Sequence, residues 1–197
     1  MSRLILASQS AARAEMLRRA GLTFETEPAK IDEAALIASF KSEQAEARGI
    51  ADALAELKAQ RVSNRHPDAI VIGADQLLIC EGEIFSKPGT RAKARRQLEA
   101  LSGRTHQLIS AVCLACSGHA IWRHVDRAEL ALRTLSGEAI DLYLAEAGDA
   151  VLQCVGAYQL EGLGVRLFAK VEGDYFTILG MPLIPLLQGL RELGAIA

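Results

Sequence analysis

The chain has 197 residues, which is enough to bury a large core, and we expect a single domain over residues 1–197. Hydrophobic residues make up 50% and charged residues 23%, proportions that fit a compact soluble protein and exclude a disordered one. The formal net charge of −2 gives no basic surplus, so we expect no nucleic-acid partner.

The apolar run in the opening residues is too short for a signal peptide, and no later apolar run reaches membrane-spanning length. We therefore expect a cytoplasmic protein with no membrane partner.

The predicted elements begin with a short buried strand at 4–7, followed by the polar loop Ser8-Gln9-Ser10. Residues 11–20 have helical composition, and Gly21 is a natural end for that helix. A strand, a small polar loop and a helix in this order form a ready site for an anion.

The remaining elements alternate between helical and strand patterns. In chain order they are a long helix over 39–65, a buried strand over 69–73 continued by 77–80, a hairpin turn at 81–82, a helix over 91–101, strands over 106–115 and 122–133, a helix over 136–145 capped by Ser136, a glycine-rich segment over 156–164, a strand over 165–171 and an amphipathic helix from Pro182. This pattern predicts one α/β domain with a mixed sheet.

The four cysteines, Cys80, Cys113, Cys116 and Cys154, have mostly apolar neighbours, which favours reduced core thiols over disulfides. Cys113 and Cys116 have CxxC spacing, but no second pair or histidine motif completes a zinc site. Positions three apart in a strand also face opposite sides of the sheet, which opposes joint ligation.

The first candidate site is the loop after the first strand. Ser8, Ser10 and Arg13 bring two hydroxyls and a guanidinium to the start of a helix, a combination suited to a phosphate chain. An ordinary helix cap at Ser10 and a solvated Arg13 are the alternative.

Carboxylates form the second candidate. Asp75 follows a buried strand, a usual position for a metal ligand or a general base at a sheet edge. A plain turn aspartate is the alternative. Glu33 is a weaker candidate, because Asp32 and Glu33 could simply favour the dipole of a helix that starts there.

Two lysines and a glycine-rich loop complete the candidates. Lys58 lies on the long predicted helix, where a lysine is usually solvated, and Lys87 precedes Pro88, which restricts its backbone. The segment 156–164 places three glycines around Glu161, so it is either a close-fitting loop against a ligand or an ordinary connection.

The order of these segments along the chain is more informative than any one of them. They are Ser8-Gln9-Ser10 through Arg13, Ile31-Asp32-Glu33, Lys58, Gly73-Ala74-Asp75, Lys87-Pro88, residues 101–106 (LSGRTH), the glycine-rich segment, residues 172–175 and residues 180–183. In this order they resemble the motifs of the Maf-like nucleoside triphosphate pyrophosphatases, also called septum-formation inhibitor Maf proteins. The resemblance covers nearly the whole chain.

The resemblance implies a long twisted mixed sheet with helices and two lobes around a cleft, often in a homodimer. It also implies hydrolysis of a nucleoside triphosphate to a monophosphate and pyrophosphate. Asp75 would be the general base, and Glu33 with Asp75 would hold Mg²⁺ or Mn²⁺. The phosphate-binding residues would be Ser8, Ser10, Arg13, Lys58 and Lys87.

Three positions of the family are associated with base selection, and here they are Ala12, Gln76 and Glu161. Gln76 and Glu161 resemble the branch that acts on 7-methyl-GTP rather than the dTTP/UTP branch. A carboxylate suits the N–H donors of guanine and would repel the carbonyls of uracil or thymine. Ala12 departs from both branches. In particular, it cannot stack on a methylated base as a tryptophan would.

Other functions stay open from the sequence alone. A non-catalytic nucleotide-binding regulator of cell division is the first, although binding alone needs no general base such as Asp75. A pyrophosphatase that prefers dTTP or UTP is the second. A general phosphatase is the third, and it would release orthophosphate instead of pyrophosphate.

Overall fold

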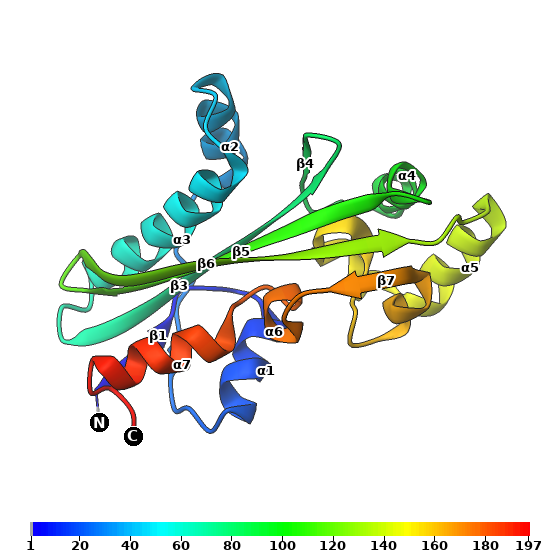
Figure 1. The fold of residues 1–197 in the computed structure, drawn as a ribbon. Helices are drawn as coiled ribbons and strands as arrows, with labels where there is room; N and C mark the ends of the chain where they lie inside the picture. Colours follow the sequence, from blue (N-terminus) through cyan, green and yellow to red (C-terminus); the bar gives the residue numbers. More distant parts are fainter. Residues whose placement is uncertain (1) are drawn as a thin grey trace. The chain divides into compact units, whose positions relative to one another are not determined.

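The computed structural model describes residues 2–197 and folds them into a mixed sheet flanked by helices (Figure 1). The strands are β1 (Arg3–Leu6), β2 (Glu25–Thr26), β3 (Ala69–Cys80), β4 (Glu83–Phe85), β5 (Thr105–Cys116), β6 (His119–Leu132) and β7 (Phe168–Glu172). The helices are α1 (Ala11–Arg19), α2 (Glu33–Ser42), α3 (Ala47–Ser63), α4 (Arg91–Leu101), α5 (Gly137–Ala147), α6 (Tyr175–Ile178) and α7 (Leu183–Glu192). Three short 3₁₀ helices, η1 (Asp149–Gln153), η2 (Val155–Ala157) and η3 (Leu163–Leu167), lie between α5 and β7.

The sheet confirms the predicted α/β class. Its strand order in the described residues is β2-β1-β3-β5-β6-β7, with β4 paired to β3. β1 runs parallel to both β2 and β3, whereas the β3–β4 and β6–β7 pairs are antiparallel. A parallel pair needs a crossover connection: α1 connects β1 to β2, and α2 and α3 connect β2 to β3.

Backbone contacts divide the chain into two compact units. Of the described residues, unit 1 contains those up to Gln76, together with Ser110–Asp126 and Gly180–Ala197. Unit 2 contains Leu77–Ile109 and Arg127–Leu179. The expectation of a single domain stays a prediction.

In unit 1, α3 packs directly against β3. The contact is close because Gly73 has no side chain: a Cβ there would lie 2.2 Å from the backbone oxygen of Ala55 and 2.6 Å from the nitrogen of Ala59. Side chains two residues apart on a strand point to the same face, so Asp75 also faces α3. The glycine therefore sets how near Asp75 comes to the helix.

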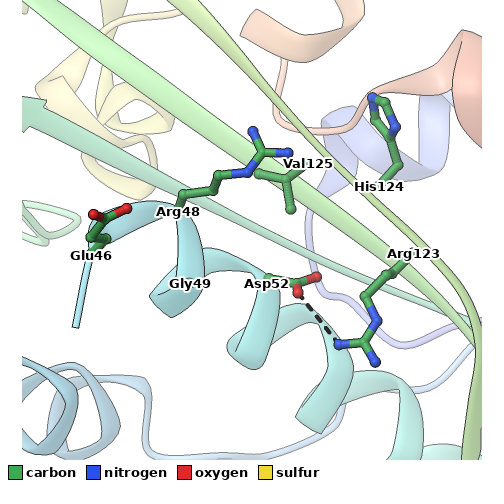
Figure 2. Close-up of a pocket in the computed structure, with 7 residues that line it drawn as sticks. All are labelled: Glu46, Arg48, Gly49, Asp52, Arg123, His124 and Val125. Carbon is green, nitrogen blue, oxygen red and sulfur yellow. Dashed lines mark hydrogen bonds and ion pairs between the residues drawn. The ribbon is translucent and has the colours of Figure 1, made fainter.

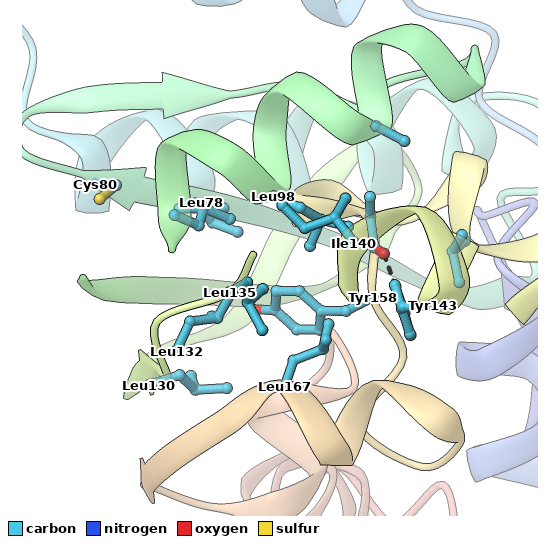
Figure 3. Close-up of a cluster of buried hydrophobic side chains, with 14 of the residues drawn as sticks. Leu78, Cys80, Leu98, Leu130, Leu132, Leu135, Ile140, Tyr143, Tyr158 and Leu167 are labelled. Carbon is cyan, nitrogen blue, oxygen red and sulfur yellow. Dashed lines mark hydrogen bonds between the residues drawn. The ribbon is translucent and has the colours of Figure 1, made fainter. Parts of the chain in front are cut away.

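Unit 2 has its own apolar core, in which the ring of Tyr158 lies among leucines such as Leu132, Leu135 and Leu167 (Figure 3). Two polar groups are buried with it. His106 is 1% exposed, and its Nε2 lies 2.7 Å from the hydroxyl of Tyr158. The hydroxyl of Tyr143 donates to the carbonyl of Ala157 at 3.1 Å. These bonds fix the start of the glycine-rich segment in the core.

The predicted helix over 39–65 is wrong, because the chain forms two helices, α2 and α3, with a break between them. Two backbone bonds close α2: Gln44 N donates to Lys41 O at 3.1 Å and Ala45 N to Phe40 O at 3.0 Å. This is the Schellman pattern, in which the residue after the cap is left-handed and usually glycine. Here Gln44 takes that position with φ 57°, so the sequence carries no glycine to mark the end.

Other predicted boundaries near the C-terminus also shift. The strand expected over 165–171 begins only at Phe168, because η3 occupies residues 163–167. The short β2 and α6 were not predicted, since two and four residues give no periodicity to detect. The remaining predicted helices and strands are present within a few residues of their expected ends.

The cysteines agree with the predicted reduced state. All four are free thiols, with Cys80 and Cys113 buried and Cys116 and Cys154 partly buried. Within residues 2–197, no helix is both long and apolar enough to cross a membrane.

Candidate active site

The predicted site residues of unit 1 gather where neither β1 nor β4 pairs with β3. β1 pairs with β3 over Ala69–Ile72 and β4 over Leu78–Cys80, so neither pairs with residues 73–77. The bond from Ala7 N to Ile72 O, at 2.8 Å, is the last along this edge before the chain turns into α1. Groups on both faces of β3 can therefore meet at this open stretch of edge.

Asp75 and Glu33 both form ion pairs with Lys58. The Nζ of Lys58 is 2.5 Å from Oδ1 of Asp75 and 2.7 Å from Oε1 of Glu33. Asp75 and Lys58 are buried, at 4% and 7% exposed, while the side chain of Glu33 is 44% exposed. One ammonium on α3 thus holds two carboxylates together beside β3.

The environment of Asp75 makes it a stronger base than an ordinary aspartate. Burial raises the pKa of its carboxyl, and the nearby charges of Lys58 and Arg13 oppose that rise without cancelling it. Glu33 adds to the rise because it repels a second negative charge. A buried carboxylate with a raised pKa at the edge of a sheet is a typical arrangement for proton abstraction.

Arg13 lies inside the protein instead of in solvent. Its Nε donates to the carbonyl of Gly180 at 2.9 Å, and its Nη1 donates to the carbonyl of Ala74 at 2.9 Å and to the hydroxyl of Ser8 at 3.3 Å. The Ala74 carbonyl is available because β1 has already ended. Burial lowers the pKa of Arg13, while Asp75 and Glu33 act in the opposite direction. The guanidinium fixes the backbone next to Asp75 and places a positive charge beside it.

The two serines shape the loop before α1. Ser10 is the N-cap of α1, its hydroxyl accepting from the amide of Arg13 at 3.3 Å, so the ordinary capping role is present. The amide of Ser10 in turn donates to the hydroxyl of Ser8 at 3.1 Å. Ala12 lies in the first turn of the same helix and is half-buried. Both hydroxyls act as acceptors here, so their protons remain able to point at an anion.

Gln76 lies between Ser110 and Gly180. Its Nε2 donates to the hydroxyl of Ser110 on β5 at 3.0 Å. On its other side lies Gly180, where a Cβ would be 3.5 Å from Oε1 of Gln76. Gly180 has φ 106°, a conformation that favours glycine, and its motif was visible in the sequence. Ser110 carried no local signal, because a lone serine in an apolar strand has no distinguishing pattern.

Lys87 and Glu161 belong to unit 2. Lys87 is exposed and lines a hollow of about 260 Å³ together with Lys93 and Arg96. Both residues affect the pKa of the Cys154 thiol. Burial raises this pKa, the charge of Glu161 raises it further, and the charge of Lys87 lowers it. They are therefore neighbours of Cys154 within unit 2, and their roles toward a substrate stay predictions.

Comparison with known proteins decides the family. The model of the Maf-like protein family matches residues 3–193. The chain belongs to this family. It is 52% identical over 190 residues to a nucleoside triphosphate pyrophosphatase of Paramagnetospirillum magneticum, covering 96% of this chain and 98% of that protein. It is 49% identical over 194 residues to a 7-methyl-GTP pyrophosphatase of Rhizobium johnstonii, covering 98% of each.

A solved structure supports the fold of this Maf-like chain. The HAM1 protein of Coxiella burnetii superposes with a TM-score of 0.50 at 18% identity, covering 98% of this chain and 100% of that one. At that identity the likeness concerns the fold alone.

Unit 1 of the Maf-like chain has a hollow as well, of about 430 Å³, between the start of α3 and β6. Figure 2 shows Arg123 facing Asp52 across it, at 3.4 Å, while Glu46 and Arg48 project from the start of α3. Its lining residues include none of the predicted site residues. The hollow is therefore separate from the Asp75 cluster in its composition, and two of its charged residues, Arg123 and Asp52, already form an ion pair.

The donor set near Asp75 limits how this Maf-like protein could hold a metal. Among residues 2–197 there is no group of three or more His, Cys, Asp and Glu side chains suited to a metal ion. Asp75 and Glu33 provide two carboxylates that both contact the ammonium of Lys58. Two carboxylates fit Mg²⁺, which usually takes its other ligands from water and substrate phosphates.

Proposed function

We propose that this Maf-like protein hydrolyses a nucleoside triphosphate between the α- and β-phosphates, giving a nucleoside monophosphate and pyrophosphate. The observation that carries this proposal is the buried Asp75 carboxylate, held 2.5 Å from Lys58 at the unpaired edge of β3. Family membership and the names of two relatives near 50% identity support the same reaction class.

Asp75 acts as the general base in this proposal. Its raised pKa makes it a better acceptor for the proton of a water molecule, and Lys58 keeps it oriented. The water then attacks the α-phosphorus, and the bond to the bridging oxygen of pyrophosphate breaks. Lys58 also offsets the repulsion between Asp75 and Glu33, so both carboxylates can stay ionised at one site.

The phosphate chain is held by the loop before α1. Donors come from the hydroxyls of Ser8 and Ser10 and from the free amides at the start of α1. Arg13, which bonds to the Ser8 hydroxyl, supplies positive charge. Arg13 does this largely through its field, because its Nε and Nη1 are engaged with carbonyls. Lys87 of unit 2 is proposed as a further phosphate contact.

Asp75 and Glu33 would hold Mg²⁺ or Mn²⁺. Such a cation offsets the negative charge of the phosphates and stabilises the charge that develops on the leaving group. A metal requirement is thus part of the proposal.

The base is proposed to be a guanine type, as in 7-methyl-GTP. Gln76 and Glu161 carry this part, since an amide oxygen and a carboxylate both accept from the N–H donors of guanine. Ala12 leaves room near the start of α1 and gives no aromatic surface for stacking.

The test is product identity across a panel of nucleotides. Purified protein is incubated with Mg²⁺ or Mn²⁺ and dTTP, UTP, GTP or 7-methyl-GTP, and pyrophosphate and orthophosphate are measured separately. We expect pyrophosphate, with 7-methyl-GTP or GTP preferred and with activity lost in Asp75→Asn. Preference for dTTP or UTP would overturn only the base assignment. Orthophosphate as first product would indicate a general phosphatase, and binding without turnover would indicate a nucleotide-binding regulator.

A further inference from the structure

The two amide atoms of the Gln76 side chain have different neighbours. Its Nε2 donates to the hydroxyl of Ser110 at 3.0 Å. Its Oε1 faces Gly180, as does the guanidinium of Arg13: a Cβ on Gly180 would lie 3.5 Å from Oε1 of Gln76 and 3.5 Å from Nη2 of Arg13. The amide carbonyl is therefore on the side of the cation, and the amide nitrogen is on the side of Ser110.

Electrostatics favours this orientation over the reversed one. A serine hydroxyl can either donate or accept, so Ser110 alone would tolerate both orientations of the amide. The guanidinium of Arg13 breaks that symmetry, because it attracts a carbonyl oxygen and repels an NH₂ group. Ser110 then acts as the acceptor that anchors the nitrogen.

Ser110 is suited to act as an anchor, because it is fully buried on a strand of the sheet. It is 0% exposed on β5, the strand next to β3, whereas Gln76 is only partly buried. Because a buried hydroxyl is costly to leave unbonded, the bond to Gln76 is one of the interactions that keep Ser110 satisfied. Through Ser110, β5 thereby fixes the side chain of Gln76 next to the candidate site.

We propose that Ser110 is a positioning residue for base selection, which keeps the Gln76 amide oriented so that its carbonyl accepts from a 6-oxopurine. This inference rests on the proposed function, in which Gln76 contacts the base. Guanine carries an N–H donor at N1, whereas adenine carries an acceptor there. A fixed carbonyl thus favours guanine-type nucleotides, and a freely rotating amide would serve both bases.

The experiment measures binding, so that it does not depend on turnover. Affinities for the non-hydrolysable α,β-methylene analogues of GTP and ATP are determined by calorimetry in Mg²⁺ for the wild type, Ser110→Ala and Ser110→Thr. We expect Ser110→Ala to reduce the preference for the GTP analogue about tenfold, and Ser110→Thr, which keeps a hydroxyl, to restore most of it.

A matched control separates positioning from a general structural effect. Ser63 is also 0% exposed in unit 1, but its hydroxyl accepts from the amide of Gly118 instead of from Gln76. Ser63→Ala is expected to leave the preference unchanged, whatever its effect on the melting temperature. In a Gln76→Ala background, Ser110→Ala is expected to change the preference no further, because its effect passes through Gln76.

Several results would overturn the inference. These are an unchanged preference in Ser110→Ala, an equal loss in Ser63→Ala, or a further loss in the Gln76→Ala background. Failure of the wild type to bind either analogue would overturn it as well. Preferential binding of the GTP analogue that responds to Ser110 as expected, without release of pyrophosphate from GTP, would sustain the inference and remove only the proposed reaction.

Discussion

At the scale of single residues, the chemistry of the site depends on charges that are buried next to one another. Asp75, Lys58 and Arg13 are all buried, and each changes the protonation of another. Removal of one member leaves an uncompensated charge, which costs much more than the loss of an exposed ion pair. The predictions for single side chains follow from this difference.

Lys58→Gln is expected to lower kcat/KM about 100-fold, the order of effect seen when one charge-stabilising donor is removed from an active site. Glu33 and Asp75 would then repel each other without the ammonium that both contact. Steady-state kinetics of pyrophosphate release measures the effect. Lys41→Gln, which removes an exposed lysine from the last turn of α2, is the control and should retain full activity. A Lys58→Gln enzyme as active as this control would show that Lys58 has no part in the reaction.

At the scale of helices and strands, close backbone contacts place the reactive groups. Gly73→Ala is expected to destabilise the fold by about 3 kcal/mol, because the new methyl group would meet the backbone of α3 and not a movable side chain. Gly49→Ala, in the first turn of α3 with open space around it, should be neutral or stabilising by about 1 kcal/mol. Urea denaturation of both variants measures this. Equal stability of the two would contradict the close β3–α3 packing.

A substitution in the break between α2 and α3 is expected to stabilise the protein, in contrast to Gly73→Ala. Gln44 pays a steric penalty for its φ of 57°, which glycine would not. Gln44→Gly is therefore expected to stabilise the protein by about 0.5–1 kcal/mol, as a midpoint shift in urea with an unchanged slope. If the variant were less stable than the wild type, the left-handed cap would be absent in solution.

At the scale of the whole molecule, stability should depend on pH through a core histidine. Burial lowers the pKa of His106 from 6.5 to about 4. The unfolded chain therefore binds a proton below pH 6.5 that the folded chain does not accept until about pH 4. Unfolding becomes easier as pH falls through this window, by roughly 2–3 kcal/mol at pH 4.5 from this group alone.

This pH dependence is measured by denaturation of wild type and His106→Gln at pH 7 and at pH 4.5. The wild type should lose more free energy of unfolding between the two pH values than the variant does. The comparison uses the change with pH, because His106→Gln also removes the bond to Tyr158 and lowers stability at both pH values. An equal change in both proteins would show that His106 is not buried as a neutral group.

Much of this arrangement could be predicted from the sequence, and the exceptions have physical reasons. Short patterns made candidates of Asp75, Lys58, Glu33, Arg13 and Ser8, the family resemblance gave them roles, and the structure brings them together in unit 1. The depth of burial of Arg13 was not predicted, because it depends on where β1 ends. Likewise, the partnership of Gln76 with Ser110 joins residues 34 positions apart, and only the pairing of strands reveals it.

The central claim is that Asp75 activates water for attack on the α-phosphorus, and hydrolysis in ¹⁸O-labelled water tests it most directly. GTP or 7-methyl-GTP is turned over with Mg²⁺, and the label is located by mass spectrometry in the nucleoside monophosphate and in the pyrophosphate. We predict label in the monophosphate alone, with formation of labelled product reduced by a factor of about 10³ in Asp75→Asn. Label in pyrophosphate or orthophosphate, or an Asp75→Asn enzyme as fast as the wild type, would contradict the account.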